Sequence, residues 1–340
     1  MQYLYTLTSS SNDNYYEQFL LSVTSLKQAM PNVKVVLLCD SKTKETLTGK
    51  RSGYEKYISD IIQVNIPSSF SQVEISRWVK TSMRNLVQGD FLFIDCDTII
   101  AEDLSSIAET QIKFGACLDK HSLIENHSKK DIIKEQDKQL NFYSSSSNRH
   151  YNSGVIYCKD TPEIKKIFER WHELWLFSSI KNIKRDQPSF NMAIYEHFDQ
   201  FTDLDGTWNC QIAYNGLPYL ANSKIIHYFA SDLVLNTSPF LPGSDNIFKK
   251  IKDSGKIPNE VMQLLQNPRS AFIAESRIVC GADMLNVINS GLFEFIFFLQ
   301  KKMPYFFKFL NRLSKIFKKL IKKNFIKSSL KKDSGIKFYN

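Results

Sequence analysis

The sequence has 340 residues, of which 43% are hydrophobic, so it can bury the core of one large α/β domain or of two smaller ones. Its formal net charge is +9, but residues 299–340 hold thirteen basic residues and one acidic residue, which leaves −3 for the remainder. A mildly acidic globule with a basic tail argues against a nucleic-acid-binding core, where positive charge would line the functional face.

The cysteines predict the cellular compartment. The six cysteines are far apart, form no Cys-x-x-Cys pair and lie mostly within apolar runs, such as Leu38-Cys39 and Tyr157-Cys158. This pattern is typical of reduced core thiols rather than of a secreted disulfide framework. The first residues also lack the pattern of a signal peptide, so we expect a cytoplasmic protein.

The first elements predict a strand, a helix and a second strand at residues 3–8, 19–30 and 33–39. The nearly continuous apolar character of the strands favours a parallel sheet, in which ligands bind at the carboxyl ends of strands. Five residues lie at or just after the carboxyl end of the first predicted strand. They are candidates to hold a base and ribose: Thr6, Leu7, Thr8, Asn14 and Tyr15. An ordinary polar loop is the alternative. No dinucleotide or P-loop glycine motif follows this strand.

A helix predicted at 74–86 carries Arg77 and Lys80 on one face, with Arg84 one turn further along that face. These side chains are either solvated or available to neutralise a phosphate or to fix a carboxylate.

The run from Phe91 to Ile100 is apolar except for Asp95 and Asp97, and reads as one strand. In an extended strand these two acids would point the same way, with Cys96 turned away. Two adjacent like charges are costly without a cation between them, and oxygen ligands suit Mg²⁺ or Mn²⁺. The alternative is that one acid caps a turn and the other is solvated.

Residues 120–148 are polar and predict a surface excursion, a candidate lid. A strand at 151–158 follows, in which Gly154 permits close approach of the backbone to a ligand. The helix at 164–176 carries Trp171 and Trp175, which we expect to face the core.

Asp186 precedes Gln187 and Pro188 in a pattern typical of a helix N-cap, and this structural role competes with a functional one. His227 ends a short strand at 225–229. An isolated histidine is usually structural, but beside carboxylates it favours a manganese site.

In order and spacing, these features resemble the GT-A glycosyltransferases of family 8, which include glycogenin and bacterial lipopolysaccharide galactosyl- and glucosyltransferases. The resemblance spans about residues 3–230 and implies a mostly parallel GT-A sheet flanked by helices. It implies Mn²⁺ or Mg²⁺ held by Asp95, Asp97 and His227, and Asp186 and Gln187 at the reacting sugar. The expected donor contacts are Thr6, Leu7, Thr8, Asn14, Tyr15, Arg77, Lys80, Cys96, Asn152, Ser153, Gly154, Trp208 and Asn209. A UDP-linked sugar donor and retention of anomeric configuration also follow from the resemblance alone.

One segment departs from the family pattern. After the metal histidine the family continues His-x-x-Gly-x-x-Lys, whereas this sequence reads His227-Tyr228-Phe229-Ala230-Ser231-Asp232-Leu233. The diphosphate would then be met by Arg77, Lys80 or Arg185. The departure leaves open a nucleotide-sugar-binding protein without turnover, and a nucleotidyltransferase is a further alternative.

The carboxyl-terminal region predicts a tail at 286–340 after a catalytic domain at 1–285. Residues 293–299 are apolar but too short to span a bilayer, and beyond Pro304 apolar residues recur with helical spacing among lysines. A basic amphipathic helix with aromatic residues is typical of an interfacial membrane anchor, with packing onto a protein as the alternative. An anionic surface at the inner face of the cell membrane would bring the site to a glycan or glycolipid acceptor, such as lipopolysaccharide or capsule.

Overall fold

The computed structural model describes residues 1–67, 69–229, 245–275 and 290–329. The chain divides into two compact units, Met1–Ser276 and Arg277–Asn340. The strands are β1 (Gln2–Leu7), β2 (Val35–Asp40), β3 (Asp60–Val64), β4 (Phe91–Ile94), β5 (Thr98–Ile100), β6 (Phe114–Leu118), β7 (Tyr151–Cys158), β8 (Phe201–Asp203), β9 (Cys210–Gln211) and β10 (Ile225–His227). The helices of the first unit are α1 (Tyr15–Ala29), α2 (Ser41–Thr46), α3 (Gln72–Leu86), α4 (Lys130–Leu140), α5 (Pro162–Ile180), α6 (Gln187–Glu196), α7 (Leu217–Leu220), α8 (Asp245–Ser254), α9 (Asn259–Gln266) and α10 (Pro268–Glu275).

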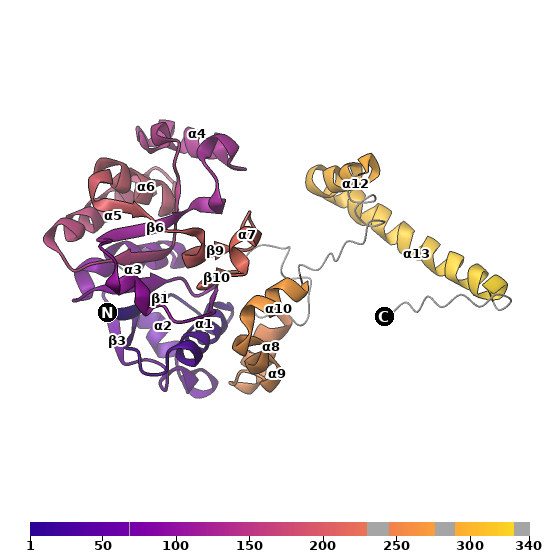
Figure 1. Cartoon of the computed structure of the whole chain (residues 1–340), viewed down its shortest axis with the longest axis horizontal. Coiled ribbons are helices and arrows are strands. Elements are labelled where there is room, and N and C mark those ends of the chain that lie inside the picture. The colour runs from indigo at the N-terminus through magenta and orange to yellow at the C-terminus, as the bar shows by residue number, and fades with distance from the viewer. Residues whose placement is uncertain (68, 230–244, 276–289, 330–340) are drawn as a thin grey trace. The chain divides into compact units, whose positions relative to one another are not determined.

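A seven-stranded sheet in the order β3-β2-β1-β4-β7-β6-β8 forms the centre of the first unit (Figure 1). Strands β1 to β4 run parallel, β7 runs antiparallel to both β4 and β6, and β6 is parallel to β8. The mostly parallel sheet flanked by helices is therefore confirmed. The carboxyl ends of β1 and β4 meet at one edge of this sheet, because the two strands pair directly.

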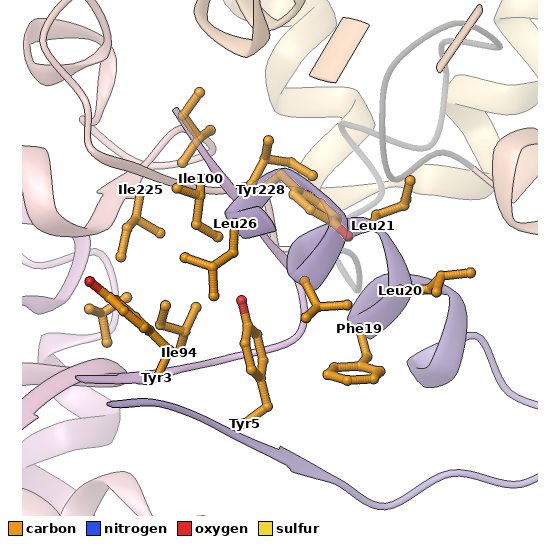
Figure 2. Close-up of a cluster of buried hydrophobic side chains, with 14 of the residues drawn as sticks. Tyr3, Tyr5, Phe19, Leu20, Leu21, Leu26, Ile94, Ile100, Ile225 and Tyr228 are labelled. Carbon is orange, nitrogen blue, oxygen red and sulfur yellow. The ribbon is translucent and has the colours of Figure 1, made fainter. Parts of the chain in front are cut away.

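Helices cover both faces of the sheet, which explains why β1 and β2 are apolar along nearly their whole length. On one face, Tyr3 and Tyr5 of β1 pack against Phe19 and Leu26 of α1 (Figure 2). On the other face, α3 and α5 pack on β2, β4 and β7. Trp171 and Trp175 of α5 are buried as expected.

A second, three-stranded sheet in the order β5-β10-β9 corrects the prediction for residues 91–100. These residues are not one strand: β4 ends at Ile94 in the large sheet, and β5 begins at Thr98 in the small one. Asp95 and Asp97 lie in the bend between them, so strand alternation is the wrong reason for their shared direction. The break arises because β5 pairs antiparallel with β10 instead of extending β4.

The surface excursion predicted at 120–148 contains regular structure. It contains the helix α4 and several short 3₁₀ turns, and it buries both apolar side chains (Ile124, Ile133, Leu140) and the carboxylate of Asp137. Buried residues of this segment stand beside exposed apolar ones, as Ile133 does beside Ile132, so the sequence does not mark which of them face inward.

Helices α8 and α9, near the end of the first unit, contact α1 and bury Ile247, Phe248, Ile251, Val261 and Leu265 in the same core as β1. The second unit contains α12 (Gly291–Lys302) and α13 (Pro304–Ser329), which contact each other. Among the helices in the described part of the chain, none combines the length and apolar character needed to cross a bilayer.

Candidate active site

A cavity of about 340 Å³ opens at the carboxyl end of β1. Three elements form it: the end of β1 with the first turn of α1, one face of α3, and the bend after β4. Its lining residues are Thr6, Leu7, Thr8, Tyr15, Gln18, Gln72, Val73, Ser76, Arg77, Lys80, Asp95, Cys96 and Asp97. Most predicted nucleotide and metal residues are thus brought together around one space.

The loop after β1 is braced from within. Asp13 accepts hydrogen bonds from the Ser9 hydroxyl and the Ser10 backbone N–H, each 2.7 Å long. Burial opposes ionisation of Asp13, but these donors hold its pKa below the usual value. Arg51 adds a 3.1 Å hydrogen bond to the Ser10 carbonyl. Asn14, predicted to touch the donor, precedes α1 and does not line the cavity.

Three groups that could hold a metal ion lie at the bend after β4. One oxygen each of Asp95 and Asp97 and a ring nitrogen of His227 lie within 4.8 Å of one another. The pairing of β10 with β5 places His227 opposite Thr98, and His227 Nε2 is 3.1 Å from Asp97 Oδ1. Burial opposes protonation of His227, yet the Asp97 and Asp95 carboxylates raise its pKa above the ordinary value.

The basic residues of α3 divide between this site and the core. The Lys80 ammonium lies 3.1 Å from both Asp95 oxygens and 3.8 Å from Asp186, and Arg77 Nε lies 3.0 Å from Asp186 Oδ1. Arg84 instead is buried against Cys158 and pairs with Asp160. Arg84 lies on the same face of α3, as expected from its spacing, but it serves the core rather than the cavity.

Asp186 precedes α6 but does not cap it, because its side chain makes no cap hydrogen bond and its backbone is already helical. Its carboxylate accepts a 2.8 Å hydrogen bond from the Ser153 hydroxyl and faces Arg77 and Lys80. Burial opposes its ionisation, but the two cations and the Ser153 hydroxyl lower its pKa to about 2. The carboxylate is thus an ionised acceptor in the site. Gln187, beside it, begins α6 and is half-buried.

The remaining predicted donor residues do not line the cavity. Asn152 and Asn209 are buried and hydrogen-bonded to each other at 3.0 Å. A Cβ at Gly154 would lie 2.5 Å from His227 Cε1, so glycine is needed here for the imidazole. Trp208 packs against the core, with the Lys224 ammonium 5.0 Å from its ring centroid.

Some site residues were not predicted from the sequence. Gln72, Val73 and Ser76 line the cavity from the face of α3 that also carries Arg77 and Lys80. Val73 lies four residues before Arg77, and Ser76 lies four residues before Lys80. This helical spacing was the available signal. Gln18, one turn into α1, belongs to the same set.

This combination of a mostly parallel sheet, a cavity at its carboxyl edge and a carboxylate–histidine cluster defines a GT-A type of transferase. The family model described as "Glycosyl transferase family 8" matches residues 6–232, which is more than half of the chain. The chain therefore belongs to glycosyltransferase family 8, and the protein is a glycosyltransferase.

The chain is also similar to solved structures of transferases. Mouse xyloside xylosyltransferase 1 in its apo form aligns at 12% identity and a TM-score of 0.46, over 68% of this chain and 98% of the mouse chain. The glycosyltransferase GlyE of Streptococcus pneumoniae TIGR4 aligns at 16% identity and a TM-score of 0.46, over 78% of this chain and 62% of GlyE. The apo form of GlyE aligns at 14% identity and a TM-score of 0.48, over 81% of this chain and 63% of the GlyE chain. No curated protein matches this chain.

Proposed function

We propose that this glycosyltransferase is metal-dependent and transfers a sugar from a UDP-linked donor with retention of configuration. The observation that carries the proposal is the cluster of Asp95, Asp97 and His227 at the cavity that begins at β1. Carboxylate oxygens with one imidazole nitrogen form a donor set that suits Mn²⁺. Held there, Mn²⁺ would supply positive charge to the departing diphosphate.

The other residues of the cavity would bind and orient the donor. Thr6, Thr8 and Tyr15 at the end of β1 would hold the base and ribose, as the carboxyl ends of parallel strands do for many ligands. Arg77 and Lys80 point two cations toward the same space, and we assign to them the diphosphate charge that the absent family lysine would meet. Residues 230–233, where that lysine is missing, lie outside the described residues.

Asp186 is proposed to act at the reacting sugar. Its carboxylate remains ionised at neutral pH and is fixed by Arg77 and Ser153. A fixed acceptor of this kind can orient a sugar hydroxyl, and Gln187 stands beside it at the start of α6.

The metal assignment is tested by thermal shift. The wild-type protein should be stabilised by Mn²⁺ with UDP, whereas Asp95→Ala and Asp97→Ala should fold and lose this stabilisation, because ligands that bind only the folded state raise its apparent stability. Asp199→Ala, at an exposed residue outside the cavity, is the control. Shifts equal to the wild-type value in both carboxylate variants would refute the metal site.

We further propose that the second unit anchors the enzyme to an anionic membrane surface at the inner face of the cell membrane. The exposed side chains of α12 and α13 include Phe297 and Phe298 on α12 and Phe306, Phe309 and Phe317 on α13. Exposed aromatic residues among lysines suit the boundary between headgroups and acyl chains. The acceptor would then be a glycan or glycolipid of the cell surface, such as lipopolysaccharide or capsule.

A further inference from the structure

A row of buried hydrogen bonds connects His227 to the segment that follows β6. His227 Nδ1 lies 3.0 Å from Asn209 Oδ1, and Asn209 Nδ2 donates to Asn152 Oδ1 at 3.0 Å. Asn152 Nδ2 then donates to Asp119 Oδ1 at 2.9 Å. All four side chains are buried. We call the three residues Asn209, Asn152 and Asp119 the relay.

The direction of these hydrogen bonds is fixed by groups that can only donate or can only accept a hydrogen bond. The backbone N–H of Gly154 can only donate, and it donates to Asn152 Oδ1 at 2.9 Å. This places the Asn152 amide nitrogen toward Asp119 and leaves its oxygen to accept from Asn209. The amide oxygen of Asn209 therefore faces His227, and because an amide oxygen only accepts, His227 Nδ1 must carry a hydrogen.

The far end of the relay is fixed in the same way. The backbone N–H of Lys129 donates to His127 Nδ1 at 3.0 Å, so the hydrogen of a neutral His127 ring is on Nε2. Nε2 lies 3.0 Å from Asp119 Oδ2 and donates to it. Burial opposes ionisation of Asp119, but its hydrogen bonds from His127 and Asn152 hold its pKa well below the usual range. Asp119 is thus an acceptor for two donors.

We propose that Asn209, Asn152 and Asp119 are positioning residues that hold His227 with Nδ1 protonated and Nε2 directed to the metal. The inference rests on the proposed metal site. It gives Asn152 and Asn209 a role other than the donor contact expected from the sequence. It also assigns a positioning role to Asp119, which His127 holds by a hydrogen bond. Partners that orient a ligating histidine typically account for about 10–100-fold in metal affinity.

The first test measures Mn²⁺ affinity without nucleotide sugar, by electron paramagnetic resonance of free Mn²⁺. Asp119→Asn offers a single oxygen to two donors, so one hydrogen bond is lost, and we expect about a tenfold weaker affinity or more. Asp137→Asn is the matched control, because Asp137 is a buried carboxylate of the same segment that bonds Ser144 and Ser145 and has no contact with the relay. It should bind Mn²⁺ as the wild type does. Equal affinity of Asp119→Asn and the wild type, or an equal loss in both variants, would overturn the proposal.

The second test uses only the wild-type protein, so it does not depend on whether a variant without the Asp119 carboxylate folds. In ¹⁵N-histidine spectra of the metal-free wild-type protein, His227 Nδ1 should carry a proton. Added Zn²⁺, a diamagnetic probe, should shift Nε2 and leave Nδ1 protonated. A metal-free His227 whose Nδ1 lacks a proton would overturn the relay. Wild-type protein that binds no Mn²⁺ would contradict the metal site instead, while the metal-free spectrum would still decide the relay.

Discussion

At Gly154 the backbone passes so close to His227 that a single methyl group does not fit. The nearest contacts of a Cβ there would be 2.5 Å to His227 Cε1 and 2.8 Å to Asn152 Oδ1, both inside van der Waals contact. The Gly154 carbonyl also accepts a 2.8 Å hydrogen bond from the Asp95 backbone N–H. One residue of β7 therefore controls the positions of two residues of the proposed metal site.

Gly154→Ala should consequently displace His227 and weaken Mn²⁺ binding by about tenfold, within the range expected when a metal ligand is disoriented. The control is Gly53→Ala, where the nearest contact of a Cβ would be an ordinary 3.6 Å. Calorimetric titration with Mn²⁺ compares the two variants. Tight binding by Gly154→Ala would show that His227 is not a ligand.

Asp186 makes stability depend on pH in a defined window. Its folded-state pKa of about 2 lies below the ordinary value of 3.8, so the unfolded chain binds the proton more tightly. The resulting stabilisation, about 2 kcal/mol, is complete above about pH 5 and is lost as the pH falls toward 2. Urea unfolding of wild type and Asp186→Asn should show a gap that is constant from pH 7 to 5 and about halved near pH 3. A gap that narrows between pH 7 and 5 would mean that the folded-state pKa is raised, not lowered.

At the scale of elements, α8, α9 and α10 belong to the catalytic unit although they follow the last candidate site residue. Ile247, Phe248 and Ile251 of α8 and Phe272 of α10 are buried in the core that contains β1 and α1. Full burial of such side chains stabilises a fold by about 1.5–3 kcal/mol each. Helices α8 and α9 therefore cover α1, whose first turn lines the cavity.

Truncation distinguishes these helices from the tail. A chain that ends at Asn289 should remain folded, with the urea midpoint of the full-length catalytic unit. A chain that ends before Asp245 should unfold or aggregate, because it exposes the apolar face of α1. Circular dichroism and gel filtration measure both. If the chain that ends at Asn289 unfolds as well, α12 and α13 are structural parts of the catalytic fold.

Much of the fold was predictable because local patterns agreed with their surroundings. Residues of β1, α1 and β2 show the periods of buried strands and an amphipathic helix, and their parallel pairing followed from that. The acid pair was identified for its chemistry, but its geometry was not: the bend at residues 95–97 depends on β5 pairing with β10, more than 120 residues away. Pairing at such distance leaves no local signal.

The same limit applies to side-chain partners. The sequence around Asp186 is compatible with a helix cap as well as with a role in the site. Only the ion pair with Arg77 of α3 shows that the carboxylate faces α3 and does not cap α6. Asp119 and His127 gave no signal of their own. The hydrogen bond from Asn152 to Asp119 and the one between His127 and Asp119 form only once the segment 119–150 packs against β7.

At the scale of the whole molecule, the charge is concentrated in one region: thirteen of the 44 basic residues lie at positions 299–340. The proposed membrane anchor would combine electrostatic attraction with burial of aromatic side chains. Its two contributions respond differently to salt, which makes them separable.

The full-length protein should float with anionic vesicles, less strongly as salt rises, since exposed charges are screened beyond about 8 Å at physiological ionic strength. A salt-resistant fraction should remain and should disappear in the double variant Phe309→Ser with Phe317→Ser, which keeps every lysine. Neutral vesicles are the control. No binding to anionic vesicles at low salt would exclude the membrane role.

The central claim, metal-dependent transfer from a nucleotide sugar, is tested most directly by incubating the purified protein with a panel of nucleotide sugars and measuring nucleotide release. With Mn²⁺, at least one UDP-sugar should be hydrolysed; chelation by EDTA and the combined Asp95→Asn and Asp97→Asn changes should abolish this, while Asp199→Asn should not. Donor binding without hydrolysis, with candidate acceptors supplied, would indicate a binding protein. Formation of a nucleotide sugar and pyrophosphate from sugar phosphate and nucleoside triphosphate would indicate a nucleotidyltransferase. Hydrolysis that persists undiminished in EDTA and in the double variant would contradict the account.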